Sequence, residues 1–368
     1  MKIDLLITEL FTGGAERCCT ELAGHLQALG HSVRVISIAP APTTRVDSLL
    51  YEHLKALKIQ TVFLNASNTY QLPWAHSRLV QWIRSDPPDL VQSFLWHANL
   101  LGAWCYSKHQ IPQVAGVRVV EPRRWRSRLA WFWRCYPKKV VCVSHEVARW
   151  ASRYEGIDSD QLAVIPNGID LDVIPASAKR EKILLFVGRL EPQKGIDVLL
   201  ERTPAILQAL PEHRLVLIGD GSWAKAWSQW AQHSPLAHRV ERLGRRADVL
   251  DWMARSELLL LPTRYEGMPN VVLEAMAVGL PIATMHVEGI EDLLGSSLNE
   301  QSAPRDDWDA WEKLLIGLAQ NPLNLERLGI FNRKRVEENF DLHAQMKKYE
   351  LLYQEILSKL PTRRGPAL

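Results

Sequence analysis

The run Leu258–Gly279 joins an apolar stretch to a helix-forming stretch through a polar loop. The apolar stretch ends at Pro262, and we expect a helix to begin near Pro269, because proline is favoured at the first helical position. The backbone N–H groups of residues 270–272 would then face outward at the positive end of the helix dipole. A helix start of this kind can bind an anion such as a diphosphate.

Two carboxylates flank this predicted anion site, Glu266 in the loop and Glu274 in the second turn of the helix. Because a carboxylate repels phosphate, the pair is better suited to accept hydrogen bonds from the hydroxyl groups of a sugar or a ribose. Either glutamate alone could be a helix cap or a solvated surface charge. The two together favour a binding site for a polyol.

A second loop carries matching positive charge. Arg189 and Lys194 lie between Gly188 and Gly195 and follow a predicted strand. They could neutralise a diphosphate, the arginine through its planar fork and the lysine as a point charge. Either cation alone could be an exposed loop charge, but the two in one strand-end loop favour anion binding.

Two further glycine-containing turns lie at predicted strand ends. Gly219-Asp220-Gly221 could let the backbone approach a ligand or could form a plain tight turn. Gly13 and Gly14 join the first predicted strand to the first helix. This pair is not a GxGxxG motif, so its position at a strand end is the argument for a binding role.

Short apolar runs alternate with amphipathic stretches along the chain, which predicts parallel sheets covered by helices on both faces. The first strand series is expected at Ile3–Thr8, Val33–Ile38, Asp89–Ser93, Gln113–Val117 and Val140–Ser144. The second is expected at Ile183–Gly188, Leu215–Gly219, Val240–Leu243, Leu258–Pro262 and Ile282–Thr284. We therefore predict an α/β protein with two doubly wound, Rossmann-like domains that face each other across a cleft.

The predicted domains cover residues 1–172 and 173–342, with a polar linker at Asp170–Glu181. A closing helix at about 343–360 could pack back on the first domain. The composition fits a globular protein, with 368 residues, 47% hydrophobic residues and a net charge of +3. The five cysteines form no CxxC pair, which is typical of a reducing cytoplasm. No stretch is long and apolar enough to span a bilayer, and the first residues indicate a strand rather than a signal peptide.

The motifs together resemble the retaining family 4 glycosyltransferases, which have the GT-B architecture. The matching pieces follow the family order along nearly the whole chain: Gly13–Arg17, Val143–Trp150, Ile165–Asp170, Phe186–Asp197, Leu215–Gly221, Glu266–Ala283 and Glu288–Asp292. The resemblance implies a transferase that moves a hexose or N-acetylhexosamine from a nucleotide-sugar to a saccharide or lipid-linked saccharide. A UDP-sugar is the preferred donor and GDP-mannose the second choice.

The resemblance also implies roles for single residues. Glu266 would bind the donor sugar, Glu274 the ribose, and Arg189 and Lys194 the departing diphosphate. The rest of the implied donor-binding set is Gly13, Gly14, Gly188, Gly219, Gly244, Arg245, Gly267, Met268, Pro269, Asn270 and Val271. The nucleotide base would lie near Gly244 and Arg245. No metal and no resident cofactor are expected, since family members of this kind need no divalent ion.

One position departs from the family pattern. Many members carry a histidine shortly after the strand that corresponds to Gln113–Val117, where this chain has Arg118. An arginine stays protonated and cannot be a general base, although it could bind phosphate or position the acceptor. His97 is the other candidate for contact with the reacting groups, and it could equally be a partly buried structural histidine.

Arginine and tryptophan residues are interleaved over residues 118–139. This pattern suits the headgroup layer of an anionic membrane, so peripheral attachment at the inner face of the cytoplasmic membrane is one interpretation. A helix with aromatic residues packed on the sheet is the other, and the pattern lacks the features of an RNA-binding module. A nucleotide-sugar epimerase on the same scaffold and a non-catalytic nucleotide-sugar binder stay open as alternatives. A bacterial cell-surface saccharide pathway is the expected context.

Overall fold

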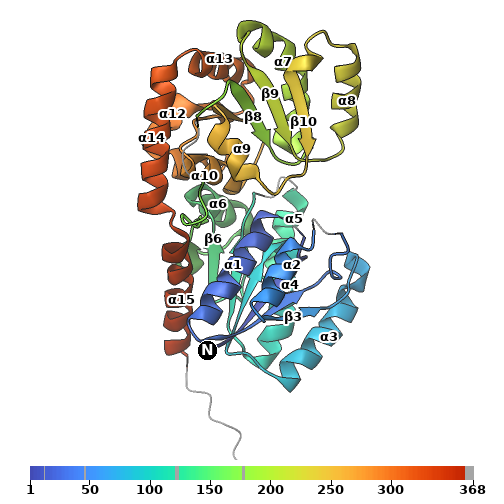
Figure 1. Ribbon diagram of the computed structural model, residues 1–368. Helices are drawn as coiled ribbons and strands as arrows, with labels where there is room; N and C mark the ends of the chain where they lie inside the picture. Colours follow the sequence, from blue (N-terminus) through green and yellow to red (C-terminus); the bar gives the residue numbers. More distant parts are fainter. Residues whose placement is uncertain (12, 45–46, 121–123, 176–178, 361–368) are drawn as a thin grey trace, which may run out of the picture. The chain divides into compact units, whose positions relative to one another are not determined.

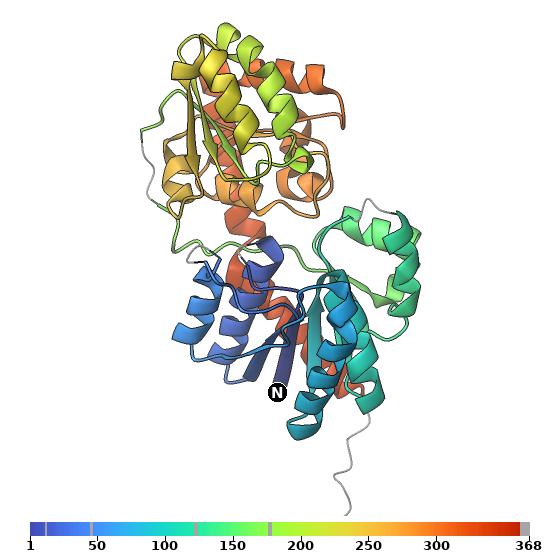
Figure 2. The same ribbon diagram turned by 90° about the vertical axis from the view of Figure 1, so that its right-hand side faces the viewer.

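The computed structural model describes residues 1–11, 13–44, 47–120, 124–175 and 179–360, apart from the side chains of residues 124–126. The chain divides into two compact units, of which the first joins Met1–Asn167 to the segment from His343 and the second is Gly168–Leu342. Each unit has a parallel sheet with helices on both faces (Figure 1; Figure 2). The predicted class, two doubly wound α/β domains, is therefore confirmed.

The described residues of the first unit form a seven-stranded parallel sheet in the order β3-β2-β1-β4-β5-β6-β7. Its strands are β1 (Lys2–Ile7), β2 (Ser32–Ser37), β3 (Gln60–Phe63), β4 (Leu90–Phe94), β5 (Gln113–Val117), β6 (Lys139–Cys142) and β7 (Leu162–Val164). The two edge strands β3 and β7 are absent from the expected set. They have four and three residues, too few for their periodicity to stand out in the sequence.

The helices of this unit connect the strands in turn. They are α1 (Gly14–Ala28), α2 (Leu49–Ala56), α3 (Leu72–Ser85), α4 (Leu95–Tyr106), α5 (Arg124–Leu129), α6 (His145–Trp150) and α15 (Leu342–Ser358), with the short helices η1 (Thr69–Gln71), η2 (Ser107–His109), η3 (Ala130–Phe132), η4 (Ala151–Glu155) and η5 (Ser159–Gln161). From the far end of the chain, α15 contributes the buried side chains of Tyr349 and Tyr353 to this unit. The Tyr353 hydroxyl donates to Gln92 Oε1 on β4 at 3.0 Å.

The described residues of the second unit form a six-stranded parallel sheet in the order β10-β9-β8-β11-β12-β13. Its strands are β8 (Ile183–Val187), β9 (Arg214–Ile218), β10 (Val240–Gly244), β11 (Leu258–Leu261), β12 (Ile282–Met285) and β13 (Ser302–Ala303). Its helices are α7 (Ile196–Ala209), α8 (Ala224–His233), α9 (Val249–Arg255), α10 (Asn270–Ala277), α11 (Ile290–Leu294), α12 (Leu298–Gln301), α13 (Trp308–Ala319) and α14 (Pro322–Asn339), with η6 (Pro192–Lys194), η7 (Ala237–Arg239) and η8 (Gly295–Ser297). The two-residue edge strand β13 was not expected.

Both sheets reverse their strand order once. The reversal lies between β1 and β4 in the first unit and between β8 and β11 in the second. At such a switch point the connections after the two strands leave toward opposite faces of the sheet, and a crevice opens at the carboxyl ends. Ligands of doubly wound sheets bind in this crevice, so the residues after β8 and β11 are the first place to look for a site.

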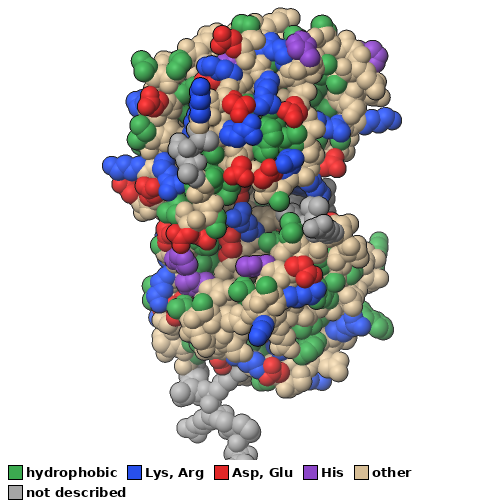
Figure 3. All heavy atoms as spheres, viewed as in Figure 1, with side chains coloured by type: hydrophobic (Ala, Val, Ile, Leu, Met, Phe, Trp, Pro, Cys, Tyr) green, Lys and Arg blue, Asp and Glu red, His purple; other side chains and the backbone are tan. Residues whose placement is uncertain are grey.

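The face of the molecule drawn in Figure 3 carries charges of both signs. Acidic and basic side chains are interspersed on the face drawn in Figure 3, in keeping with the net charge of +3. All five cysteines are free thiols, and only Cys135 is exposed. Among the described residues, no helix combines the length and hydropathy needed to cross a bilayer.

The connections that follow β8 and β11 touch backbone to backbone at Gly195. This residue, which immediately precedes α7, has a φ angle of +67°, and a Cβ atom placed on it would lie 1.7 Å from the carbonyl oxygen of Pro262. Only glycine tolerates both the left-handed conformation and the approach of a neighbouring carbonyl. The contact sets the separation of the two connections.

We predict that Gly195→Ala lowers the free energy of unfolding by more than about 2 kcal/mol, because it adds a steric clash to a strained backbone conformation. Urea unfolding monitored by circular dichroism measures the change. Gly317→Ala is the matched control, since a Cβ atom on that exposed glycine in α13 would meet nothing within 4 Å. The control should raise stability by about 0.5–1 kcal/mol, as expected for glycine in a helix interior. Equal effects of the two substitutions would contradict the role of the contact.

Candidate functional site

The two loops singled out by their sequence lie on either side of the switch point in the second unit. The first loop connects β8 to α7, and the second connects β11 to α10. Strands β8 and β11 pair directly, with Leu258 opposite Leu184 and Leu259 opposite Leu185. The loops therefore emerge side by side from the carboxyl edge of the sheet, which explains why residues about 70 positions apart share one site.

An ion pair links these two loops. Lys194 Nζ donates to Glu266 Oε1 at 2.5 Å, and the two side chains are only 15% and 9% exposed. The Thr263 hydroxyl donates to the same carboxylate oxygen at 2.8 Å. We predicted separate roles for these residues, one for phosphate and one for sugar, and the structure joins them in one charge-balanced pair. An anion that approached Lys194 would compete with Glu266 for the ammonium group.

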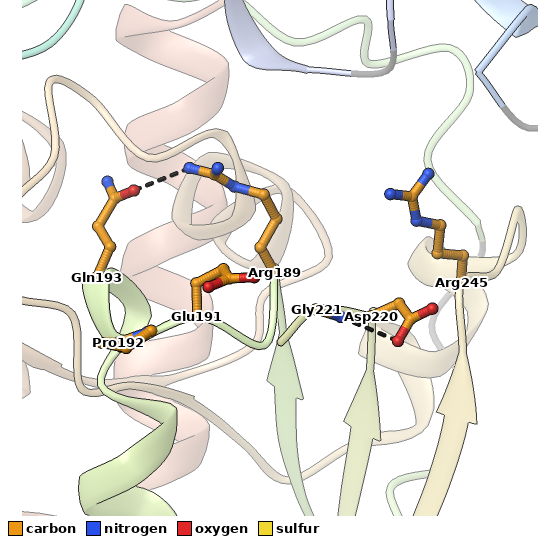
Figure 4. A pocket seen from close by; sticks show the side chains of 7 residues that line it. All are labelled: Arg189, Glu191, Pro192, Gln193, Asp220, Gly221 and Arg245. Carbon is orange, nitrogen blue, oxygen red and sulfur yellow. Dashed lines mark hydrogen bonds between the residues drawn. The ribbon is translucent and has the colours of Figure 1, made fainter. Parts of the chain in front are cut away.

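A cavity of about 540 Å³ opens at the carboxyl ends of β8, β9 and β10. It is lined by Arg189, Glu191, Pro192, Gln193, Asp220, Gly221 and Arg245 (Figure 4). Arg189 and Arg245 extend past the strand ends on either side of the Asp220–Gly221 turn, and Arg189 Nη2 donates to Gln193 Oε1 at 2.8 Å. Two guanidinium groups over one cavity suit a ligand that carries several negative charges.

Glu191, which lines this cavity, links the loop after β8 to the turn after β9. Its carboxylate accepts a hydrogen bond from the Ser222 backbone N–H at 2.8 Å and another from the Ser222 hydroxyl at 2.7 Å. These two hydrogen bonds lower the pKa of Glu191, so the carboxylate is ionised at neutral pH. Because its oxygens accept hydrogen bonds from the turn after β9, Glu191 holds two neighbouring loops together. Sequence reasoning did not single out Glu191, since its partner is 31 positions away.

Gln193 connects the cavity to the loop that carries Glu266. Besides accepting from Arg189, its side chain donates to the Tyr265 backbone oxygen at 3.1 Å. Its own backbone oxygen accepts from the Arg264 N–H at 2.9 Å. Gln193 was not singled out from the sequence either, because a neutral side chain beside two cations does not by itself indicate a binding role.

Arg264 fastens the β11–α10 loop to α7. Its two terminal nitrogens donate to the two carboxylate oxygens of Asp197 at 2.8 and 2.7 Å. The guanidinium carbon also lies 5.2 Å from the centre of the Trp308 ring. Burial tends to raise the pKa of Asp197, but the hydrogen bonds and charge of Arg264 outweigh it and the pKa is lowered. Neither residue was predicted to support the site.

The start of α10 differs in one respect from expectation. Pro269 precedes the helix instead of occupying its first position, and the Val272 N–H donates to the Pro269 carbonyl oxygen at 3.1 Å. The expectation that the Val272 N–H faces outward is therefore wrong, because the first turn of the helix uses it. Gly267, Met268 and Pro269 are buried, whereas Asn270, Val271 and Glu274 are half-buried. Their contacts with a donor stay predictions.

Three of the predicted glycines lie in a row. Gly188, Gly219 and Gly244 stand at the carboxyl ends of the neighbouring strands β8, β9 and β10. The Gly188 N–H donates to the Ile218 carbonyl at 2.9 Å, and the Gly219 N–H donates to the Gly244 carbonyl at 2.8 Å. This row forms the edge from which Arg189 and Arg245 extend.

The predicted residues of the first unit share the carboxyl edge of its own sheet. Gly13 and Gly14 lie at the junction with α1, His97 lies in the first turn of α4, and Arg118 follows β5. Strands β1, β4 and β5 are neighbours at the switch point of this sheet. Leu95, two positions before His97, has a φ angle of +71°, which is rare for a branched side chain and typical of functional turns.

Arg118 is bound within its own unit. It donates to the Tyr349 hydroxyl at 3.3 Å and to Asn167 Oδ1, and its guanidinium carbon lies 5.9 Å from the centre of the Phe94 ring. These contacts tie α15 to the end of β5. Arg118 therefore has a structural function that the sequence did not reveal, and its contact with a substrate stays a prediction.

Comparison with known proteins assigns a family to this arrangement. The model for "Glycosyltransferase Family 4" matches residues 12–173, and that for "Glycosyl transferases group 1" matches residues 181–321. The glycogen synthase of Mycobacterium tuberculosis is 26% identical and is aligned over 89% of this chain and 88% of its own length.

A second relative and a solved structure agree. The UDP-Gal:alpha-D-GlcNAc-diphosphoundecaprenol alpha-1,3-galactosyltransferase of Escherichia coli is 24% identical over 76% of this chain and 78% of its own length. The crystal structure of Anabaena HepE with UDP and glucose superimposes with a TM-score of 0.83 at 20% identity, covering 98% of this chain and 100% of HepE. The chain belongs to the family 4 glycosyltransferases with the GT-B fold, enzymes that use nucleotide-sugar donors.

Proposed function

We propose that this enzyme transfers a hexose or N-acetylhexosamine from a UDP-sugar to a saccharide or lipid-linked saccharide, with retention of configuration and without a metal ion. The observation that carries the proposal is the Lys194–Glu266 pair, which lies at the switch point beside a cavity lined by Arg189 and Arg245. Cell-surface polysaccharide or lipopolysaccharide synthesis is the proposed context.

The donor diphosphate is assigned to Arg189 and Lys194, together with the start of α10. As the bond between sugar and diphosphate breaks, negative charge grows on the departing oxygen, and preorganised cations stabilise it without a proton transfer. This use of fixed cations supports the proposed metal independence. Glu266 is assigned to the hydroxyl groups of the donor sugar, and Glu274 to those of the ribose.

The ion pair between Lys194 and Glu266 couples these two assignments. In the free enzyme the ammonium group balances the carboxylate. A diphosphate that attracts Lys194 leaves lone pairs of Glu266 available to accept hydrogen bonds from sugar hydroxyls, while Thr263 keeps the carboxylate in place. Complete donor would thus satisfy both charges, which neither a free sugar nor an isolated phosphate could do.

The choice of UDP rests on relatives. The Escherichia coli relative is named for a UDP-galactose donor, and HepE was solved with UDP. The base is assigned to the end of β10 near Gly244 and Arg245, at the far side of the cavity from Gln193 (Figure 4).

We predict that Lys194→Ala and Glu274→Ala each lower kcat/KM for the donor by roughly 10²-fold, since each removes a charged contact to the donor. Steady-state kinetics with UDP-sugars and an acceptor measure the effect. Lys313→Ala and Glu326→Ala are matched controls, because both residues are exposed on helices of the same unit. Unchanged kinetics in both site variants, with controls also unchanged, would contradict the assignment of the donor site.

The first unit is proposed to bind the acceptor and to touch an anionic membrane. Within residues 118–139, residues 121–123 and the side chains of 124–126 lie outside the described part. Of the others, Trp131, Phe132 and Tyr136 are 64%, 56% and 52% exposed. Large exposed aromatic side chains in the same short segment as the exposed Arg128 and Lys138 suit the interface of an anionic bilayer.

Other residues of this segment have structural roles instead. Trp133 is fully buried in the unit. Arg134 donates to the backbone oxygens of Glu155 and Gly156 at 3.3 and 3.0 Å, and Lys139 donates to that of Asp160 at 2.6 Å. Some residues of the arginine–tryptophan segment therefore pack within the unit and others are exposed. The proposed membrane surface is confined to the exposed ones: Arg128, Trp131, Phe132, Tyr136 and Lys138.

We predict that the protein co-sediments with vesicles of phosphatidylglycerol and phosphatidylcholine at low salt, and that the double variant Trp131→Ser/Phe132→Ser loses most of this binding. The reason is that interfacial attachment scales with buried apolar area. Trp74→Ser is the control, since Trp74 is 68% exposed on α3 of the same unit. Failure of the unmodified protein to bind, or an equal loss in the control, would remove the proposed surface.

A further inference from the structure

A third connection supports the loop that carries Glu266. It joins β12 to α11 and contains Glu288 and Gly289. Strand β12 pairs with β11, with Leu259 opposite Ile282 and Leu261 opposite Thr284. The connections after these two strands are therefore neighbours at the carboxyl edge of the sheet, and contact between them follows from the topology.

Glu288 bonds directly to the backbone of Glu266. One oxygen of its carboxylate, Oε2, accepts the Glu266 N–H at 3.2 Å. The other, Oε1, accepts from Arg305 Nη2 at 2.5 Å. The Glu288 side chain is 11% exposed, whereas that of Arg305 is 45% exposed. A nearly buried carboxylate thus bridges the site loop and a cation at the surface.

Gly289 provides a second, independent contact between the same two connections. Its φ angle is +78°, and a Cβ atom placed on it would lie 2.4 Å from the Gly267 carbonyl oxygen and 2.8 Å from Met268 Cα. Two successive residues therefore meet the site loop, one through a charged side chain and one through its backbone. The loop cannot shift toward β12 without disturbing both contacts.

The two ends of Glu266 are held by different groups. Lys194 and Thr263 bind its side-chain carboxylate, and Glu288 binds its backbone N–H. A donor that drew Lys194 away from the carboxylate would leave the backbone contact with Glu288 available to hold the residue. Two acidic and two basic groups also balance locally, because Lys194 faces Glu266 and Arg305 faces Glu288.

We propose that Glu288, oriented by Arg305, is a positioning residue that sets the place of Glu266 and thereby the affinity for the sugar part of the donor. The inference rests on the proposed function, in which Glu266 binds the donor sugar. Its effect should be larger on binding of the sugar than on binding of the nucleotide. The cavity assigned to the base is lined from the connections after β8, β9 and β10, on the other side of the switch point from β12.

The test compares the binding of nucleotide and nucleotide-sugar by the full chain. Isothermal titration calorimetry with UDP, UDP-glucose and UDP-N-acetylglucosamine gives dissociation constants for wild type, Glu288→Ala, Glu288→Gln and Arg305→Ala. We expect Glu288→Ala to weaken binding of the preferred UDP-sugar by roughly tenfold or more, as for a displaced positioning group. Binding of UDP should change less than about threefold, which is the size of effect left by a distant substitution.

The conservative variant separates positioning from folding. Glutamine at position 288 keeps an oxygen that can accept the Glu266 N–H, so Glu288→Gln should retain most of the affinity for the UDP-sugar. Arg305→Ala should give an intermediate loss because it frees the Glu288 carboxylate to rotate. Glu300→Ala and Arg327→Ala are controls that break a surface ion pair of the same kind in the same unit, and they should bind both ligands like wild type.

Three outcomes would overturn the inference. Equal losses for UDP and UDP-sugar in Glu288→Ala would mean that the residue only supports the fold. Full retention of UDP-sugar affinity in both Glu288→Ala and Arg305→Ala would mean that Glu266 is positioned without them, with the proposed function still standing. If wild type bound UDP and both UDP-sugars with the same affinity, the sugar would make no net contribution to binding. The proposed role of Glu266 would then be contradicted, and this inference with it.

Discussion

The organisation of the second unit depends on the contact between two connections at the reversal of its strand order. Gly195 lies against the Pro262 carbonyl, and the next residue back, Lys194, reaches Glu266 across the same gap. A parallel sheet places the two strand ends side by side, but it does not fix the distance between the loops that follow them. The backbone contact does so, and the ion pair then sets which charges face the crevice.

The charges around this site are balanced pair by pair. Lys194 faces Glu266, Arg264 faces Asp197, and Arg305 faces Glu288. Because removing charges from water costs much of what their attraction returns, such pairs are weak evidence for stability. Their concentration around one loop is better explained by binding, since a ligand with a diphosphate and several hydroxyl groups needs cations and acceptors already in place.

The sequence was sufficient to predict the fold and to single out the charged residues in glycine-bounded loops, because strand ends and helix starts leave local signals in the sequence. The sequence was insufficient to predict the role of a residue whose partner lies far away along the chain. Glu191, Gln193, Arg264 and Glu288 act through contacts across neighbouring loops. Three of them lie in the matching motifs, but no local pattern indicates which partners they bind. Trp133 and Arg118 have structural roles that the sequence did not reveal, for a related reason. A residue type suited to a membrane or a substrate also suits the interior, and only packing shows which contacts it makes.

The most direct test of the account is calorimetric titration of the wild-type protein with UDP, GDP and ADP, each with and without EDTA. If the crevice between the β8 and β11 connections is a metal-free donor site, UDP binds with the same affinity in both buffers and more tightly than GDP or ADP. Binding that disappears in EDTA would contradict the assignment of the diphosphate to protein cations. A lack of binding by all three nucleotides would contradict the donor site itself.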